Sequence, residues 1–185
     1  MNTARKKRSQ GLTLVECLVT LALVATLLRL AVPALGEVIT SASVAASSSD
    51  ILSELRLARS EALKRNWRVT VCKSADGAHC ASDGGWEQGW ILFHDRDNNG
   101  SADAGEEIIS HHEALPADLL LRGNRQVADY ISFSSSGTTQ TVGGAFQAGT
   151  LTLCRKSTAT TRATQLVLNA LGRPRIQKST VNRCI

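Results

Sequence analysis

The hydrophobic pattern changes twice along the chain, and the two changes predict three segments. Residues 1–11 are polar and basic, whereas residues 12–35 are apolar apart from two charged and a few small residues. An apolar run of roughly 20 residues or more can cross a bilayer as a helix. The helical pattern continues from Glu37 to Asn66, so a single long helix is expected over residues 12–66.

The second half of this predicted helix has one apolar face. Apolar residues recur there at helical spacing, at Ile51, Leu55, Ala58 and Ala62. Glu61 and Arg65 form a favourable i,i+4 pair on the other side. This pattern predicts an amphipathic helix that lies on the β-sheet of its own chain.

Residues 67–185 have the pattern of short strands, because alternating apolar segments are broken by Gly, Asn and Ser. The expected strands are Arg68–Cys72, Gly89–His94, Glu107–His111, Tyr130–Phe133, Thr150–Cys154, Gln165–Asn169 and Pro174–Gln177. The predicted fold class is therefore α+β: a long N-terminal helix whose second half packs on an antiparallel β-sheet head.

Charge is strongly segregated, although the net charge is only +5. Four cations lie near the start, at Arg5, Lys6, Lys7 and Arg8. Residues 76–121 contain ten acids and one base, and residues 130–185 contain seven bases and no acid. A basic tail of this kind indicates a polyanionic partner.

The four early cations also predict the orientation of the apolar helix, because positive charge stays on the cytoplasmic side. The head is then exported, where cysteines form disulfides. Four of the five cysteines lie in the head, at Cys72, Cys80, Cys154 and Cys184. Three pairings are possible. Local closure favours Cys72–Cys80 with Cys154–Cys184, and the sequence does not exclude the other two.

Glu16 distinguishes the apolar run from an ordinary secretory signal, which would be cut near Ala34 or Gly36 and discarded. A carboxylate within the hydrocarbon region costs roughly 2.5–3.5 kcal/mol on insertion scales, so it indicates a function. Arg29, the other charge in the run, can snorkel to the interface and is assigned no function.

The segment Gly11–Glu16 (Gly-Leu-Thr-Leu-Val-Glu) and the apolar residues 17–23 resemble the class III signal of type IV pilins and pseudopilins. The resemblance implies that prepilin peptidase removes the leader, residues 1–11, by cutting between Gly11 and Leu12. The amine of Leu12 is then methylated, and residues 12–35 remain as transmembrane segment and filament core. Most members have Phe or Met at the position of Leu12. Glu16 is implied to pair with the N-terminal amine of a neighbouring subunit during assembly.

Residues 57–66 (Leu-Ala-Arg-Ser-Glu-Ala-Leu-Lys-Arg-Asn) closely resemble the end of the helix in the FimT/GspH family of minor pilins and pseudopilins. The resemblance implies a type IV pilin-like fold and other pilin or pseudopilin subunits as partners. It also implies a single-pass inner-membrane protein with a periplasmic head, which later enters a pilus or pseudopilus.

An acidic segment between two predicted strands fits the calcium-loop pattern of EF-hands. Its oxygen ligands would be Asp95, Asp97, Asn99, Asp103 and Glu106. A strand precedes it where an EF-hand has a helix, and Ala102 stands where a bulky aliphatic residue is usual. A β-hairpin turn is therefore favoured, since Asp, Asn and Gly form turns readily, and calcium is kept as the alternative.

The C-terminal tail has the sequence Gly172-Arg173-Pro174-Arg175, followed by Lys178. In extended backbone Arg173 and Arg175 point the same way, roughly 6.6 Å apart, which is near two nucleotide rises of duplex DNA. Gly172 is expected in a hairpin turn, where it permits close approach of a ligand. Further cations could enlarge the surface, at Arg155, Lys156, Arg162 and Arg183.

The alternative interpretation of this tail is a solvated strand end without a binding function. However, no acid follows Asp129 to neutralise it. The tail also resembles a Gly-Arg-x-Arg element that contacts DNA in the DNA-binding FimT proteins of naturally transformable bacteria. The resemblance implies phosphate contacts to double-stranded DNA, with little sequence specificity and a strong salt dependence.

Catalysis is not expected, because the four histidines have no metal-site spacing and no phosphate loop or nucleophile elbow is present. No cofactor is expected either. The favoured function is that of a FimT-like minor type IV pilin, which takes part in pilus biogenesis and binds extracellular DNA for uptake in natural transformation. The alternative is a GspH-like minor pseudopilin of the type II secretion system with a structural role.

Overall fold

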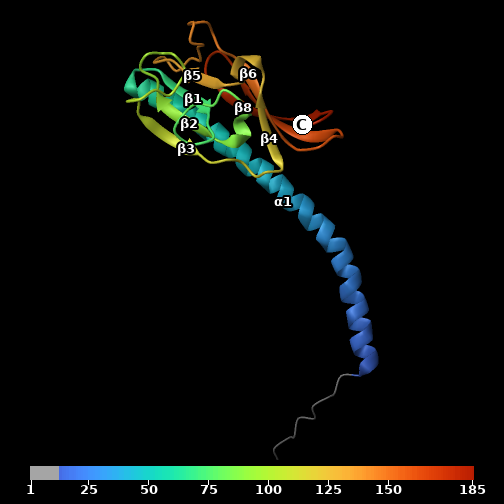
Figure 1. Ribbon diagram of the computed structural model, residues 1–185. Coiled ribbons are helices and arrows are strands. Elements are labelled where there is room, and N and C mark those ends of the chain that lie inside the picture. Colours follow the sequence, from blue (N-terminus) through green and yellow to red (C-terminus); the bar gives the residue numbers. More distant parts are fainter. Residues whose placement is uncertain (1–12) are drawn as a thin grey trace, which may run out of the picture. The chain divides into compact units, whose positions relative to one another are not determined.

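The structure, a computed structural model, describes residues 13–185, apart from the side chains of residues 30–35, 37 and 38 (Figure 1). The predicted leader and the cleavage residues Gly11 and Leu12 lie outside the described residues. The chain divides into two compact units, Met1–Ala42 and Ser43–Ile185. Each is considered by itself below.

Helix α1 covers Leu14–Arg65, which agrees with the long helix expected from the sequence. It ends at Asn66, whose φ of 52° is left-handed, a conformation that asparagine adopts at helix C-termini. Arg65 donates hydrogen bonds to Glu61 one turn earlier (2.7 Å) and to Glu107 (3.1 Å), which directly precedes strand β3 (Ile108–His112). The predicted Glu61–Arg65 pair is therefore present, and a second carboxylate connects the end of α1 to the head.

Within the described side chains, no helix combines the length and apolar character that crossing a membrane requires. The predicted span, residues 12–35, includes Leu12 and six further positions whose side chains are not described.

The head contains two four-stranded sheets in which all neighbours are antiparallel. The first has the order β3-β2-β1-β5, with β1 Val69–Lys73, β2 Trp90–His94, β3 Ile108–His112 and β5 Tyr130–Phe133. The second has the order β4-β6-β7-β8, with β4 Leu119–Gly123, β6 Gly149–Arg155, β7 Thr161–Leu168 and β8 Pro174–Val181. Two short 3-10 helices, η1 Trp86–Gln88 and η2 Arg125–Val127, lie between strands.

All seven predicted strands are present, with ends displaced by up to four residues, and β4 was missed. Its residues Leu119, Leu120 and Leu121 are all buried, so β4 has no alternation of apolar and polar positions. The division of the head into two sheets was also not foreseen.

One hydrophobic core joins α1 to both sheets. The predicted apolar face of α1 is fully buried, with exposed fractions of 0–1% for Ile51, Leu55, Ala58 and Ala62. These residues share a cluster with β-strand residues such as Val71 of the first sheet. The expectation of an α+β fold, with the second half of the helix packed on the sheets, is confirmed.

Both disulfides have the pairing that local closure favoured. Cys72 is bonded to Cys80, with their Cα atoms 5.6 Å apart, and Cys154 is bonded to Cys184, with their Cα atoms 6.1 Å apart. The first closes the loop after β1. The second attaches the C-terminal end to β6, where Ser157 and Cys184 also form an isolated antiparallel bridge.

Candidate functional site

Strand β8 and the turn before it present the predicted DNA-binding cations at the edge of the second sheet: Arg173 lies in the turn, and Arg175 and Lys178 lie in β8. Strand β8 pairs with β7 alone, so its other edge has no neighbouring strand among the described residues. Arg173, Arg175 and Lys178 are all exposed. Lys178 Nζ donates a hydrogen bond to Thr164 Oγ1 (3.3 Å), and no ion pair among the described residues involves any of the three.

The turn between β7 and β8 determines the backbone position of Arg173. The backbone N–H of Gly172 donates to the carbonyl oxygen of Asn169 (2.9 Å), and the N–H of Arg173 donates to Asn169 Oδ1 (2.9 Å). Gly172 has a φ of +70°, a conformation that glycine adopts without steric cost. The predicted hairpin turn is therefore present.

Gly172 itself is buried, which differs from its expected place beside a ligand. A methyl group on it would lie 2.2 Å from the carbonyl oxygen of Gly137. The absence of a side chain thus serves the packing of one turn against another, whereas Arg173, Arg175 and Lys178 are the exposed members of the predicted site.

Two further arginines lie close to this turn, and the sequence interpretation did not select them. Arg56 and Arg59 of α1 line an open groove together with Arg173. In the sequence these two arginines are three positions apart and have no acid one helical turn away. Such a pair is typical of a solvated helix face, and only the fold places the tail beside it.

The supporting cations of the tail are not equivalent. Arg155 Nε lies 3.1 Å from Asp118 Oδ2, so a carboxylate just before β4 neutralises it. The sequence analysis found no acid near Arg155, because Asp118 is distant along the chain and comes close to it only in the fold. The positive surface is correspondingly smaller than predicted around Arg155.

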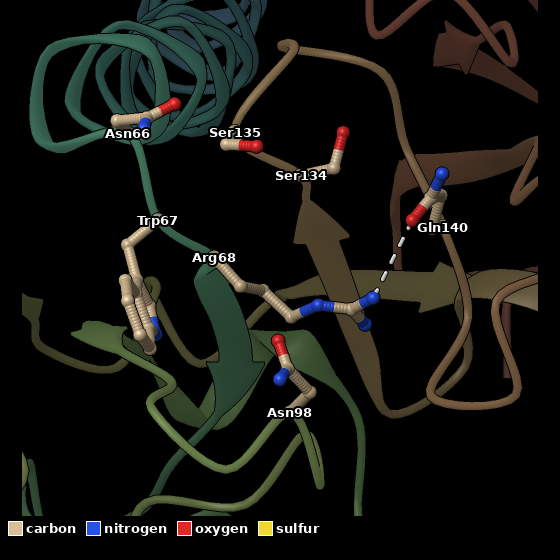
Figure 2. Close-up of a pocket in the computed structure, with 7 residues that line it drawn as sticks. All are labelled: Asn66, Trp67, Arg68, Asn98, Ser134, Ser135 and Gln140. Carbon is tan, nitrogen blue, oxygen red and sulfur yellow. Dashed lines mark hydrogen bonds between the residues drawn. The ribbon is translucent and has the colours of Figure 1, made fainter.

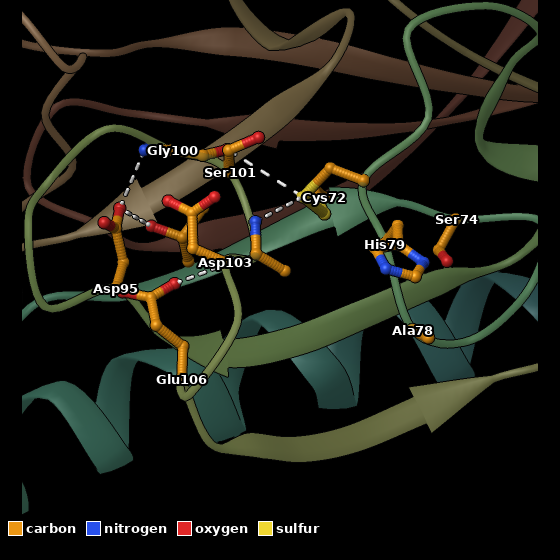
Figure 3. Close-up of a disulfide and its surroundings, with 12 residues drawn as sticks. Cys72, Ser74, Ala78, His79, Asp95, Gly100, Ser101, Asp103 and Glu106 are labelled. Carbon is orange, nitrogen blue, oxygen red and sulfur yellow. Dashed lines mark hydrogen bonds between the residues drawn. A yellow bond between two sulfur atoms is a disulfide. The ribbon is translucent and has the colours of Figure 1, made fainter.

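The acidic segment forms the turn between β2 and β3, as the sequence favoured (Figure 3). Asp95, Asp97 and Glu106 each place one carboxylate oxygen within 4.8 Å of the others, so three of the five predicted ligands meet. The other two predicted ligands are Asn99 and Asp103. Asn99 links Asp103 to this group, because its Nδ2 donates to Asp97 Oδ2 (2.8 Å) and to Asp103 Oδ2 (2.6 Å).

Donors of the protein itself already contact these carboxylates. Asp95 Oδ2 accepts hydrogen bonds from Thr70 Oγ1 (2.8 Å) and from the N–H of Gly100 (3.1 Å), and Glu106 Oε1 accepts one from the N–H of Arg96. Burial raises the pKa of Asp95 above its ordinary value, and these hydrogen bonds act in the opposite direction. The geometry therefore fits a self-contained turn, and calcium stays the alternative prediction for this loop.

A polar pocket of about 300 Å³ lies where α1 meets β1 (Figure 2). Arg68 lies along it and donates to the carbonyl oxygen of Thr141 (3.2 Å) and to Gln140 Oε1 (3.5 Å). These hydrogen bonds connect the segment after β5 to the start of β1. Because the donors of Arg68 are already used within the protein, the pocket is a weak candidate for a ligand site.

Glu16 lies in the first turn of α1, next to Thr13. The N–H of Glu16 donates to Thr13 Oγ1 (3.3 Å), and the N–H of Thr13 donates to Glu16 Oε2 (3.4 Å). This reciprocal pattern is a capping box, which the Thr-x-x-Glu spacing could have indicated. The carboxylate thus has a local partner as well as the intermolecular role that the resemblance implies.

Three of the four histidines make a local contact, and the fourth, His111, directly precedes His112 in β3. His112 stacks on Trp90 with ring centroids 4.1 Å apart, and His94 meets Trp67 edge to face at 6.0 Å. His79 Nδ1 lies 2.8 Å from Asp76 Oδ2, and this contact, with two backbone donors, holds the pKa of Asp76 well below its usual range. In the part of the chain that the structure describes, no histidine belongs to a group able to hold a metal.

Comparison with known proteins gives both a family and a fold. The family model described as type II transport protein GspH matches residues 47–172. The crystal structure of the type IV minor pilin FimU of Pseudomonas aeruginosa is 17% identical, covers 79% of this chain and 98% of its own, and has a TM-score of 0.55. The minor pseudopilin EpsH of Vibrio cholerae is 13% identical, with 73% and 96% covered and a TM-score of 0.49. No curated protein sequence gives a significant match. The likeness to FimU shows a shared fold.

Proposed function

The chain belongs to the GspH family, and on that premise we propose that this minor pilin-like subunit joins a type IV pilus and binds double-stranded DNA for uptake. The family match ends at Gly172, so Arg173, Arg175 and Lys178 lie beyond it. DNA binding is therefore a proposal about this chain's own tail and does not follow from family membership.

The observation that carries the proposal is a row of unpaired cations on a rigid support. Arg173 and Arg175 are exposed and have no ion-pair partner among the described residues. Arg175 lies on the edge strand of a four-stranded sheet, and Arg173 directly precedes that strand. The Cys154–Cys184 disulfide holds the chain beyond β8 against β6. A backbone held in this way limits where the two guanidinium groups can lie, and a guanidinium fork matches the geometry of phosphate oxygens.

The proposed route to the pilus uses the first unit. Prepilin peptidase would cut between Gly11 and Leu12, and the apolar run would anchor the mature chain in the inner membrane. Glu16 would then pair with the N-terminal amine of a neighbouring subunit and select the correct stagger, since a buried charge requires an opposite one.

The second candidate is a minor pseudopilin of type II secretion, which the description of the matching family favours. In that role the cations of β8 would contact another subunit or solvent. Experiments in cells distinguish the two candidate functions. Variants of the tail that lower transformation with normal piliation support the pilus, and loss of secretion supports the pseudopilin.

Binding is tested with the full chain in a non-ionic detergent, by fluorescence anisotropy with labelled duplex DNA at several salt concentrations. Arg173→Gln/Arg175→Gln is compared with Arg96→Gln/Arg125→Gln, which removes the same charge from exposed positions elsewhere on the head. Each lost phosphate contact should lower the slope of log K against log salt by about 0.9. Equal binding by the two variants, or no binding by the unsubstituted chain, contradicts the proposal.

A further inference from the structure

A groove of about 390 Å³ lies between α1 and the turn that precedes β8. Its lining residues come from these two elements only: Arg56, Arg59, Ser60 and Leu63 from α1, and Arg173 and Pro174 from the turn. Three of the six are arginines. The groove is open on one side and lies wholly within the second unit, Ser43–Ile185.

The helix residues of the groove form one stripe, because positions 56, 59, 60 and 63 repeat at i, i+3, i+4 and i+7. This stripe lies beside the buried stripe of Ile51, Leu55, Ala58 and Ala62, and within it Arg59 is half-buried whereas Arg56 is exposed. Arg56 and Arg59 carry like charges one turn apart, an arrangement that is unfavourable in an isolated helix. No ion pair involves either of them within the described residues.

The third arginine is brought to the stripe by two glycine contacts. Gly172 packs on the carbonyl of Gly137, and a methyl group on Gly137 would lie 3.1 Å from Arg59 Nε and 3.2 Å from Leu63 Cδ2. The turn around Gly137 is therefore in contact with α1 on one side and with the turn before Arg173 on the other. Three like charges are thus assembled by packing that the fold provides without a ligand.

Arg59 supplies a second observation that points to an absent acceptor. Its Nε is buried and has no hydrogen-bond partner in the described structure. An unsatisfied buried donor is destabilising, the more so on a charged group. An anion bound in the groove would lower the repulsion between the three arginines.

We propose that this groove binds one backbone phosphate of the DNA that β8 contacts, so that α1 forms part of the nucleic-acid surface. The inference rests on the proposed function and adds Arg56 and Arg59 to it. A guanidinium fork matches phosphate geometry, and the open side lets a polymer enter and leave. Arg173 belongs to both the groove and the tail, which makes the two cationic surfaces continuous.

The test measures duplex binding by the full chain in a non-ionic detergent. Arg56→Gln/Arg59→Gln is compared with the same-charge control Arg96→Gln/Arg125→Gln. Loss of one phosphate contact should weaken binding roughly tenfold at 0.1 M salt and lower the salt slope by about 1 relative to the control. Arg59→Lys, which keeps the charge and loses the fork, should fall between the two.

Controls separate this inference from folding and from the proposed function. Arg56→Gln alone changes an exposed side chain and should keep the melting temperature while still lowering the salt slope. If Arg175→Gln/Lys178→Gln weakens binding and the Arg56/Arg59 variant matches the control, the groove is refuted and the tail stands. No DNA binding by the unsubstituted chain overturns both. Binding to phosphatidylglycerol vesicles that depends on Arg56 and Arg59, with DNA binding unchanged, assigns the groove to lipid and also refutes the inference.

Discussion

Gly172 sits where two turns meet, and its conformation determines the position of the arginine that follows it. The residue has a φ of +70°, and its Cα faces the carbonyl oxygen of Gly137. A side chain here would meet backbone, which cannot move aside as a flexible side chain can. The two turns would have to separate, and Arg173 would leave the groove.

Gly172→Ala should therefore destabilise the head more than the same change at Gly144. Gly144 also has a positive φ, +80°, but no atom lies within 4 Å of a methyl group placed there. Gly144→Ala should cost about 1–2 kcal/mol from backbone strain, and Gly172→Ala should cost more because a contact is added to the strain. Urea unfolding of both variants measures the difference. Equal losses would show that the contact with Gly137 relaxes without cost.

Single residues also show the limit of interpretation from sequence. The Glu61–Arg65 pair could be predicted because the two residues lie one helical turn apart. Arg56 and Arg59 could not be selected, because the third arginine of their groove is more than a hundred positions away along the chain. Asp118 escaped notice for the same reason, although it neutralises Arg155.

At the scale of elements, periodicity explains both what was predictable and what was missed. The buried face of α1 follows directly from a 3.6-residue repeat, and seven strands follow from alternation between turn residues. Strand β4 carries three successive buried leucines, so neither repeat describes it. The separation into two sheets depends on which strands pair, and that choice is made by tertiary packing.

The two disulfides should contribute unequally to stability. Cys72 and Cys80 are 8 positions apart, whereas Cys154 and Cys184 are 30 apart, so the second closes the longer loop in the unfolded chain. Chain-entropy arguments give about 2.6 kcal/mol for the first and about 3.7 kcal/mol for the second.

Cys154→Ser/Cys184→Ser should thus lower the free energy of unfolding more than Cys72→Ser/Cys80→Ser, as measured by urea unfolding of each double variant. It should also weaken DNA binding, because β8 loses the attachment beyond its end. A larger loss from the Cys72/Cys80 variant would show that the contact between Cys80 and the acidic turn, where the N–H of Ala102 lies 3.3 Å from Cys80 Sγ, outweighs loop closure.

At the scale of the whole molecule, the proposed function requires that the apolar run be kept after processing. Mass spectrometry of the mature protein should find Leu12 as a methylated first residue. A first residue beyond the apolar run, such as one following Ala34 or Gly36, would contradict the pilin assignment of this segment. The measurement is independent of the head and of DNA.

The arrangement of β8 has one further consequence for the free protein. An uncovered strand edge offers unpaired backbone groups to any other extended chain, including the same strand of a second copy. Side by side, two copies of β8 would bring Arg175 and Lys178 of one near those of the other, and neither side chain has an ion-pair partner among the described residues. The charges proposed to hold a polyanion should therefore also oppose the pairing of two free heads through β8.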